Sequence, residues 1–414
     1  MKLSIKEIAD FCGIEAKLSG DIYKISTDSR DVDENTLFVA LIGEHFDGND
    51  FVADVLSKGA KAVVCSRYDG DDERVLLVKD TGEALLKIAK GYRKKFNIPF
   101  IALTGSVGKT TSKGMIYSVV SQKYNTLRTA GNLNNEIGVP KTLFCLEESH
   151  QAAVIEMGMN HFDEISRLSQ TVLPDIGVIT NVGTAHIENL GSREGILKAK
   201  CEILHGMKKG SPLIINGDND MLKTVATADY TIIKFGLEKD NDIYAENIIP
   251  QQDGSRFDVI YGKDKAKCFV PAVGMHNVYN ALCAICVGIQ LGYSLEEASK
   301  GVAAFEPEGM RQKVTEINGM TFIEDCYNAN PDSMKSAIES LAMCPGRKVA
   351  VLGDMYELGS ESVAMHRELG EVCVKEGIDE LITCGELGAD IAEAAKEAGM
   401  TRVTHFADRE SLQN

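Results

Sequence analysis

The chain has 414 residues and a formal net charge of −17 at pH 7, with 44% hydrophobic residues. This length predicts roughly two to four domains at about 100–200 residues each, and the hydrophobic content is sufficient for sizeable cores. The acidic balance argues against nucleic-acid binding, which needs a basic surface. The sequence contains no apolar run of about 18 residues and no cationic leader, so we expect neither a membrane span nor an export signal.

Residues 1–95 predict a small mixed α/β domain. Short apolar runs that are typical of strands surround one helical stretch, "NDFVADVLSKGA". The strand-like runs are "KISTDSRDV", "TLFVALIG", "AVVCS" and "RVLLVKD".

Residues 96–305 alternate strands and helices in a pattern that is typical of a parallel sheet. "AAVIEMG", "DIGVITNVG" and "SPLIING" are nearly uninterrupted apolar runs, as expected for strands that helices cover on both faces. "SREGILKAKCEILHGM" is helical, and "DIYAENIIP", "SRFDVIYG" and "AKCFVPAVG" favour an antiparallel addition. We therefore predict a central, mostly parallel sheet.

Residues 306–414 alternate again and predict a second open α/β sheet. The strand-like runs are "MTFIEDC", "RKVAVLGD", "ELITCG" and "RVTHF". "FEPEGMRQ" is the expected hinge before them, because Pro307 and Gly309 interrupt it. The chain is thus expected to form three α/β domains.

The stretch "FIALTGSVGKTTSKGMIYSVV" predicts a phosphate-binding loop. A buried strand, a tight turn and a helix follow one another, and backbone N–H groups at such a junction point at an anion. Lys109 is expected to reach the outer phosphates of ATP, and Thr110 to offer its hydroxyl to Mg²⁺. The loop is shorter than usual, G-x-x-G-K-T, which indicates an unusual user of ATP. The predicted ATP-binding residues are Gly105, Ser106, Val107, Gly108, Lys109, Thr110 and Thr111.

Polar residues at two further strand ends are candidates for a metal site. Ligands of open α/β sheets bind beyond the carboxyl ends of the strands. Glu156 ends "VIEMG", and Asn181 and His186 follow the strand "GVIT". Mg²⁺ prefers oxygen ligands, so we favour Glu156 as a metal ligand over a structural cap; for His186, which is a less typical ligand, both roles stay open.

Two stretches between the strands allow both a functional and a structural interpretation. "TAGNLNNEIGVP" contains Asn132, Asn134 and Asn135, whose amides either read a polar ligand or support a turn. Lys198 and Lys200 lie in a helical stretch, and from spacing alone we expect both to be solvated.

The stretch "CYNANPDSM" follows a strand and precedes a helix. Asp332 or Ser333 could cap that helix. A cap explains the proline and the aspartate, but it does not explain both Asn328 and Asn330.

The eleven cysteines are scattered and odd in number, which favours free thiols in a reducing cytoplasm. Cys283 and Cys286 form one C-x-x-C pair inside the helical stretch "NALCAICVGIQLG". Because no second pair follows, we interpret them as small apolar core residues and not as a redox or metal site.

Several motifs, taken together, resemble the Mur ligases of peptidoglycan synthesis. They occur in the order "TGSVGKTT", "GNLNNEIG", "EMGMN", "TNVGTAHIENLGS", "AKCEIL", "GMHNVYNALCA", "CYNANPDSM" and "VLGDMYELG". The N-terminal "STDSRDVDENTLFVALIGEHFDGNDF" is similar to a uridine-nucleotide domain, and "NANPDSM" is similar to the member that adds a D-alanyl dipeptide. The resemblance covers nearly the whole chain.

The resemblance implies an ATP-dependent ligase that joins D-alanyl-D-alanine to UDP-N-acetylmuramoyl-tripeptide. In this family the γ-phosphate moves to a carboxylate, and the amine then displaces phosphate from the acyl phosphate. Both steps join anions, so catalysis depends on positioning and on cations. The resemblance further implies two Mg²⁺ ions, a cytoplasmic monomer, and domains spanning 1–95 (uridine nucleotide), 96–305 (ATP) and 306–414 (closing domain).

The resemblance also implies roles for individual residues. Lys109, Lys200 and His186 would be catalytic, and Lys200, in "AK-x-E-I", would carry a carbamate formed from CO₂. Magnesium would bind Thr110, Glu156, His186 and the carbamate. ATP would also contact Asn277 and Arg311. The implied substrate-binding residues are Ser29, Arg30, Asp47, Gly48, Asn132, Asn134, Asn135, Asp325, Tyr327, Asn328 and Asn330.

Four positions depart from the family pattern. Asn49 stands where a histidine is expected, and Asp163 where glycine is common. Glu324 and Cys326 replace the usual aspartate and serine. Family members also continue beyond "DRESLQN" with another strand and helix, so the third sheet is expected to be short at its end.

Three alternatives compete with this interpretation. The neighbouring Mur ligase, which adds the third amino acid to UDP-N-acetylmuramoyl-dipeptide, shares the first two domains but normally has a different tetrapeptide in place of "NANPDSM". Folate polyglutamate synthetases share the short phosphate loop but lack a uridine domain. A P-loop switch that only hydrolyses ATP would need neither the uridine-like domain nor "NANPDSM".

Overall fold

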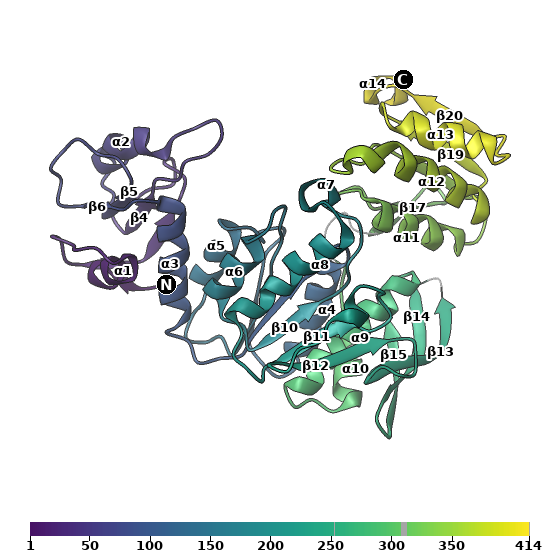
Figure 1. Cartoon of the computed structure of the whole chain (residues 1–414), viewed down its shortest axis with the longest axis horizontal. Helices are drawn as coiled ribbons and strands as arrows, with labels where there is room; N and C mark the ends of the chain where they lie inside the picture. The colour runs from purple at the N-terminus through teal and green to yellow at the C-terminus, as the bar shows by residue number, and fades with distance from the viewer. Residues whose placement is uncertain (252, 308–312, 414) are drawn as a thin grey trace.

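The computed structural model describes residues 1–251, 253–307 and 313–413. Three α/β units follow one another along the chain, with the N-terminal unit (purple) and the C-terminal unit (yellow) at opposite ends of the central one (Figure 1). The class expected from the sequence, α/β with three domains, is confirmed. No helix in the described residues combines the length and the apolar character that a membrane crossing requires.

The N-terminal unit is built on a parallel sheet in the order β3-β4-β5-β6. A small antiparallel pair, β1 (Leu3–Ser4) and β2 (Asp21–Ile22), precedes it. Helix α3 contacts both α1 and the central helices α5 and α6, so it joins the two units. The bounds are α1 (Ile5–Cys12), β3 (Lys24–Ser26), β4 (Thr36–Val39), α2 (Val52–Ser57), β5 (Ala62–Cys65), β6 (Val75–Leu77) and α3 (Thr81–Arg93).

The central unit contains a nine-stranded sheet in the order β15-β14-β13-β12-β11-β10-β7-β9-β8. The strands from β8 to β13 are parallel, whereas β13-β14 and β14-β15 are antiparallel, as the sequence predicts. The bounds are β7 (Phe100–Thr104), β8 (Thr126–Arg128), β9 (Ala152–Glu156), β10 (Ile176–Ile179), β11 (Pro212–Asn216), β12 (Thr231–Gly236), β13 (Ile243–Gln251), β14 (Gly254–Tyr261) and β15 (Asp264–Val270).

Helices cover both faces of the central sheet, and the side chains of β7 pack against the helices on both faces. Ile101 and Leu103 pack with α4, α9 and α10, whereas Phe100 and Ala102 pack with α5, α6 and α8. Adjacent strand residues point to opposite faces, so a strand buried on both sides must be apolar throughout. The helices are α4 (Lys109–Val120), α5 (Gly138–Phe144), α6 (Glu164–Val172), α7 (Ile187–Leu190), α8 (Arg193–Cys201), α9 (Met275–Gln290) and α10 (Leu295–Ala303).

The C-terminal unit has a parallel sheet in the order β18-β19-β20. The sequence predicts "MTFIEDC" as a strand of this sheet, and that placement is wrong: β17 pairs with β16 in a separate antiparallel hairpin. Most residues of both hairpin strands are exposed, unlike those of a buried strand of a parallel sheet. The bounds are β16 (Lys313–Ile317), β17 (Met320–Glu324), α11 (Pro331–Ala342), β18 (Val349–Leu352), α12 (Ser362–Lys375), β19 (Glu380–Cys384), α13 (Gly388–Glu397), β20 (Val403–Phe406) and α14 (Arg409–Gln413).

All eleven cysteines are free, which confirms the expectation from their number and spacing. Cys283 and Cys286 are fully buried within α9, in the core that this helix shares with the sheet. The interpretation of the C-x-x-C pair as core packing is therefore confirmed.

Candidate functional site

The phosphate loop connects β7 to α4 as predicted. Gly108 has a φ of +76°, a conformation that residues with a Cβ rarely adopt. At Gly105 a Cβ would lie 1.9 Å from Thr180 Oγ1, so only glycine allows this approach to the end of β10. Both glycines are thus required by the shape of the loop.

Asn181, two residues after the end of β10, holds the loop in place. Its Oδ1 accepts hydrogen bonds from the amides of Ser106 (3.0 Å) and Val107 (2.9 Å). Ser106 Oγ in turn accepts one from the amide of Gly183, at 3.0 Å. Two amides that the sequence predicts to face an anion therefore donate to Asn181. The amides available to a phosphate are those of the first turn of α4, which have no acceptor within the helix.

Lys109 folds back over this loop. Its Nζ donates to the carbonyl of Gly105 at 2.7 Å and to that of Ser106 at 3.3 Å. The ammonium thus lies where the loop meets the helix, as expected for a cation that contacts outer phosphates.

Glu156, at the end of β9, lies beside the phosphate loop because β7 and β9 are neighbours and Leu103 is paired with Glu156. Its Oε2 accepts from Thr110 Oγ1 at 3.2 Å, and its Oε1 accepts from Asn134 Nδ2 at 2.9 Å. Only 1% of Glu156 is exposed. The structure therefore brings together three residues that the sequence singles out from three separate stretches.

Lys113 is a member of this cluster that the sequence analysis missed. Its Nζ lies 3.2 Å from Glu156 Oε2, and the exposed fractions of the two side chains are 0% and 1%. The same Nζ donates to the carbonyl of Gly131 at 2.9 Å. The available signal was helical spacing: Lys113 is three residues after Thr110 and hence on the same face of α4.

His186 lies in the connection between β10 and α7, with a φ of +65°. Its Nδ1 donates to Glu357 Oε2 of the C-terminal unit at 2.5 Å. Burial lowers the pKa of His186, opposed by the Glu357 carboxylate, and the charges of Lys109 and Lys200 lower it further. His186 therefore shares its surroundings with both lysines.

The expectation that Lys198 and Lys200 are both solvated is confirmed for Lys198 and wrong for Lys200. Lys198 is exposed, with its Nζ 5.6 Å from the centre of the Phe162 ring, whereas Lys200 is 1% exposed. Burial, and secondly the charge of Lys109, lower the pKa of Lys200 well below its usual value. Within the described residues, no acceptor or carboxylate pairs with its amine. The side chain is thus a buried base whose neutral form is favoured.

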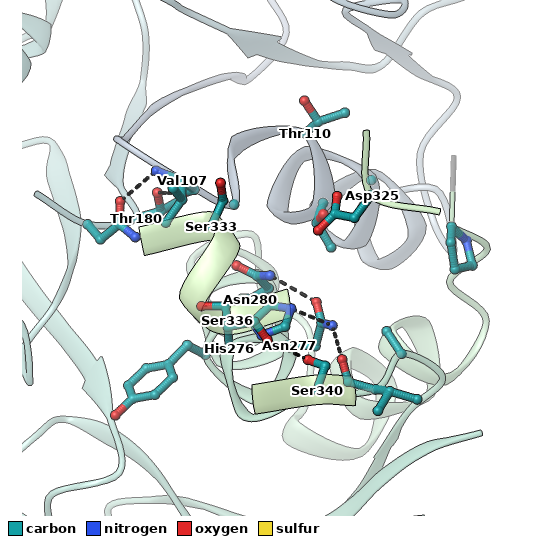
Figure 2. A pocket seen from close by; sticks show the side chains of 18 of the residues that line it. Val107, Thr110, Thr180, His276, Asn277, Asn280, Asp325, Ser333, Ser336 and Ser340 are labelled. Carbon is teal, nitrogen blue, oxygen red and sulfur yellow. Dashed lines mark hydrogen bonds between the residues drawn. The ribbon is translucent and has the colours of Figure 1, made fainter. Parts of the chain in front are cut away.

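A cavity of about 180 Å³ lies between the phosphate loop, the start of α9 and the C-terminal unit. Asn277 lines it and is 2% exposed, with its Nδ2 bound to the carbonyl of Val273 at 2.7 Å and its Oδ1 bound to Asn280 Nδ2 at 3.1 Å. Figure 2 shows the part of the C-terminal unit that lines this cavity: Asp325 and the serines of α11, of which Ser336 and Ser340 lie beside His276 and Asn277. These serines are Ser333, Ser336 and Ser340.

The C-terminal unit contacts the loop that carries His186 at a second point. Asp332 Oδ2 accepts from the amide of Thr184 at 3.0 Å. A Cβ on Gly183 would lie 2.0 Å from the same oxygen, so the glycine makes room for the carboxylate. The predicted cap at Asp332 or Ser333 is wrong in part. Asn330 is the N-cap of α11 and Ser333 completes a capping box, while Asp332 bridges two units.

The remaining C-terminal candidates lie around the start of α11 or before it. Tyr327 is 45% exposed, and the Oδ1 of Asn328 accepts from the amide of Ala329 at 3.0 Å. The cap accounts for Asn330 structurally. Arg311 lies outside the described residues.

Two of the uridine-side candidates, Asp47 and Gly48, lie in one loop of the N-terminal unit. Asp47 caps a short 3-10 helix and pairs with Arg67 at 3.2 Å, and a Cβ on Gly48 would lie 2.5 Å from the carbonyl oxygen of Leu41. Asn49 is buried and accepts from the amides of Ser66 and Arg67, so it ties this loop to the end of β5.

Two other uridine-side candidates lie in the preceding loop. The carbonyl of Ser29 accepts from Lys58 at 3.1 Å, and Arg30 is paired with Asp28 at 2.7 Å while remaining exposed. In the Asn-rich loop, Asn132 is exposed and Asn135 accepts from the amide of Gly138 at 2.9 Å. Of these three asparagines, Asn134 is the one that donates to the carboxylate of Glu156.

Family models match three parts of the chain. They are described as "Mur ligase family, catalytic domain" (residues 21–93), "Mur ligase middle domain" (103–288) and "Mur ligase, glutamate ligase domain" (310–414). The UDP-N-acetylmuramoyl-tripeptide–D-alanyl-D-alanine ligase of Bacillus subtilis (strain 168) is 38% identical, over 100% of this chain and 92% of that protein. The chain belongs to the Mur ligase family.

Other relatives of this Mur ligase are similar to it over most of their length. The Escherichia coli (strain K12) protein of the same name is 37% identical, over 94% of this chain and 86% of its own. A crystal structure of MurF from Acinetobacter baumannii has a TM-score of 0.90 at 34% identity, covering 98% of this chain and 90% of that one. MurF from Thermotoga maritima, in complex with ADP, has a TM-score of 0.83 at 27% identity and covers 94% of each chain.

The bridge from Asp332 to Thr184 yields a first prediction for this Mur ligase. Asp332→Asn keeps the shape of the side chain but removes its charge, and hydrogen bonds to charged groups contribute about 1.5–3 kcal/mol. We therefore expect kcat/KM for ATP to fall about tenfold, because docking of the C-terminal unit weakens. Steady-state kinetics measure the loss, and Glu339→Gln, an exposed change on the same helix, is the control. Equal kcat/KM in both variants would show that the bridge contributes nothing to turnover.

Proposed function

We propose that this chain is an ATP-dependent ligase that joins D-alanyl-D-alanine to UDP-N-acetylmuramoyl-tripeptide, with release of ADP and phosphate, in the cytoplasm. One observation carries the proposal: ligases of that name are similar to this chain over all three of its units, including the one that contains "NANPDSM". The three units are proposed to divide at residues 95 and 305.

The proposed ATP site is the cavity between the central and C-terminal units. Asn280 donates a hydrogen bond to Asn277 there, and the amide of Asn277 is proposed to contact the base. The phosphates would extend to the first turn of α4, where the helix dipole and Lys109 favour negative charge. We further propose that the protein acts as a monomer.

The residues present fit magnesium. Thr110 and Glu156 offer a hydroxyl and a carboxylate 3.2 Å apart, which are the oxygen donors that Mg²⁺ prefers. His186 and a carbamate on Lys200 complete the proposed ligand set. Among the described residues no three His, Cys, Asp or Glu side chains gather at one point. When bound, Mg²⁺ neutralises charge on the phosphates.

The first proposed step activates the carboxylate of the tripeptide. A carboxylate oxygen forms a bond to the γ-phosphorus, and the bond from that phosphorus to the ADP oxygen breaks. Charge accumulates on the transferred phosphoryl group, and Lys109 contributes a positive charge that is already in place. The Asn181 clamp keeps the loop, and therefore Lys109, in a fixed position.

The second proposed step forms the amide bond. The amine of D-alanyl-D-alanine attacks the acyl carbon and loses a proton, and phosphate leaves with the electrons of the C–O bond. We propose that the C-terminal unit supplies the dipeptide site through Asp325, Tyr327, Asn328 and Asn330, and that Arg311 contacts ATP. The loops with Ser29, Arg30, Asp47 and Gly48 would bind the uridine nucleotide.

Phosphate release tests the proposed function. We expect purified protein with ATP to release phosphate only when UDP-N-acetylmuramoyl-tripeptide and D-alanyl-D-alanine are both present, because the amine is needed for turnover. L-alanyl-L-alanine is the matched control. Turnover with UDP-N-acetylmuramoyl-dipeptide and a single amino acid would instead identify the neighbouring ligase, and hydrolysis of ATP alone would identify a switch.

A further inference from the structure

Lys113 is a buried cation for which the proposed reaction has so far no use. It lies within α4, one turn after the phosphate-binding Lys109, and its side chain is completely inaccessible to solvent. A buried lysine is rare unless it is paired. Its partner is Glu156, the residue that we propose as a magnesium ligand.

We infer that Lys113 is a positioning residue that holds Glu156 in place and sets how strongly the site responds to magnesium. The inference rests on the proposed function of Glu156. Lys113 does not touch ATP or the reacting atoms in this scheme; it acts through the carboxylate.

Lys113 and Asn134 together hold the carboxylate of Glu156. Nζ lies 3.2 Å from Glu156 Oε2 and 2.9 Å from the carbonyl oxygen of Gly131. Asn134 holds the other oxygen, Oε1, at 2.9 Å. Each carboxylate oxygen thus has its own donor, and both donors connect to the Asn-rich loop, so the loop and the carboxylate must move together.

The charge of Lys113 has a second consequence. Burying a carboxylate away from water costs much free energy unless a positive charge compensates it. Lys113 supplies that charge before any metal binds. A divalent cation at Glu156 therefore meets a carboxylate that is already oriented and partly neutralised, and it does not have to order the site.

Lys113→Met tests both consequences, because methionine fills a similar volume without charge. We expect a lower melting temperature without metal, because Glu156 is left unpaired. We further expect MgCl₂ with ADP to raise the melting temperature of the variant more than that of the unchanged protein, because the cation now supplies the missing charge. We expect kcat to fall about 10–100-fold, as is usual when a group that orients a metal ligand is lost.

Three further variants keep the test decisive if Lys113→Met alone folds poorly. The double variant Lys113→Met/Glu156→Gln removes both charges, so we expect its melting temperature to recover while its response to MgCl₂ and its activity stay lost. Lys113→Arg retains the charge and should recover part of kcat. Lys123→Met, which breaks an exposed ion pair just beyond the same helix, should match the unchanged protein.

The outcomes separate this inference from the proposed function. An equal response of Lys113→Met and the unchanged protein to MgCl₂ and ADP would overturn the role of Lys113, provided that Glu156→Gln abolishes that response. If Glu156→Gln also responds like the unchanged protein, then Glu156 is not a magnesium ligand, and the proposed metal site and this inference both fail.

Discussion

Lys109→Ala is expected to lower kcat by about 10²–10³-fold, the loss that follows removal of one preorganised donor to a developing anion. Lys109 Nζ lies at the junction of the phosphate loop and α4, bound to the carbonyls of Gly105 and Ser106. During phosphoryl transfer negative charge builds up on this side of ATP, and alanine offers no positive charge to stabilise it. Steady-state phosphate release at saturating ATP and both substrates measures the effect.

The fold should survive this change. Lys109→Ala removes two hydrogen bonds to the loop carbonyls, but the hydrogen bonds to Asn181 and the close approach of Gly105 to Thr180 do not involve the Lys109 side chain and remain. The melting temperature should therefore stay close to that of the unchanged protein. Lys123→Ala, at an exposed ion pair, is the matched control and should keep its activity. A Lys109→Ala protein with near-normal kcat would exclude Lys109 from the transfer step.

Lys200→Ala is expected to reduce kcat by at least about 10²-fold, because loss of a proposed metal ligand should cost no less than loss of an outer partner of a ligand, which costs about 10–100-fold. Lys200 is buried on α8 and no acceptor among the described residues pairs with it. Its amine would add to CO₂: a new N–C bond forms, one proton leaves, and the product is an anionic carbamate. The anion would attract magnesium, which an ammonium would repel.

The lowered pKa of Lys200 determines how carbamate formation depends on pH. Burial and the charge of Lys109 lower that pKa well below its usual value. The neutral amine, which is the form that reacts with CO₂, is therefore present at lower pH than for an exposed lysine. Activity in CO₂-depleted buffer should be low and should return with bicarbonate, and carbon-13 NMR with labelled bicarbonate should show a carbamate signal that Lys200→Ala lacks.

Lys198→Ala is the matched control for Lys200→Ala. Lys198 lies on the same helix, is exposed, and points about 200° away around the helix axis. It should remain active. A short carboxylic acid should restore part of the rate of Lys200→Ala, because it supplies the missing anion. A fully active Lys200→Ala protein would show that Lys200 is only a core residue.

Local features of the sequence predict much of the fold. The strand-turn-helix of residues 100–120, the alternating order of the central unit and its antiparallel addition all follow from apolar periodicity and from glycine at positions that need it. The hairpin of β16 and β17 escapes such reasoning, because periodicity identifies a strand but not the strand with which it pairs.

The candidate site divides in the same way. The chemistry of Lys109, Thr110 and Glu156 follows from residue type and from their places at strand and helix ends, which the sequence alone determined. The opposite fates of Lys198 and Lys200 were decided only by packing, because two positions on one helix differ in burial according to what lies against each face.

Only the tertiary structure could identify Lys113 as the partner of Glu156 and bring Glu357 to His186 across 171 residues of chain. The physical reason is the separation along the chain over which each kind of interaction acts. Turn chemistry and helical or strand periodicity act between residues a few positions apart. Burial and the pairing of buried charges depend on which distant segments the fold brings together.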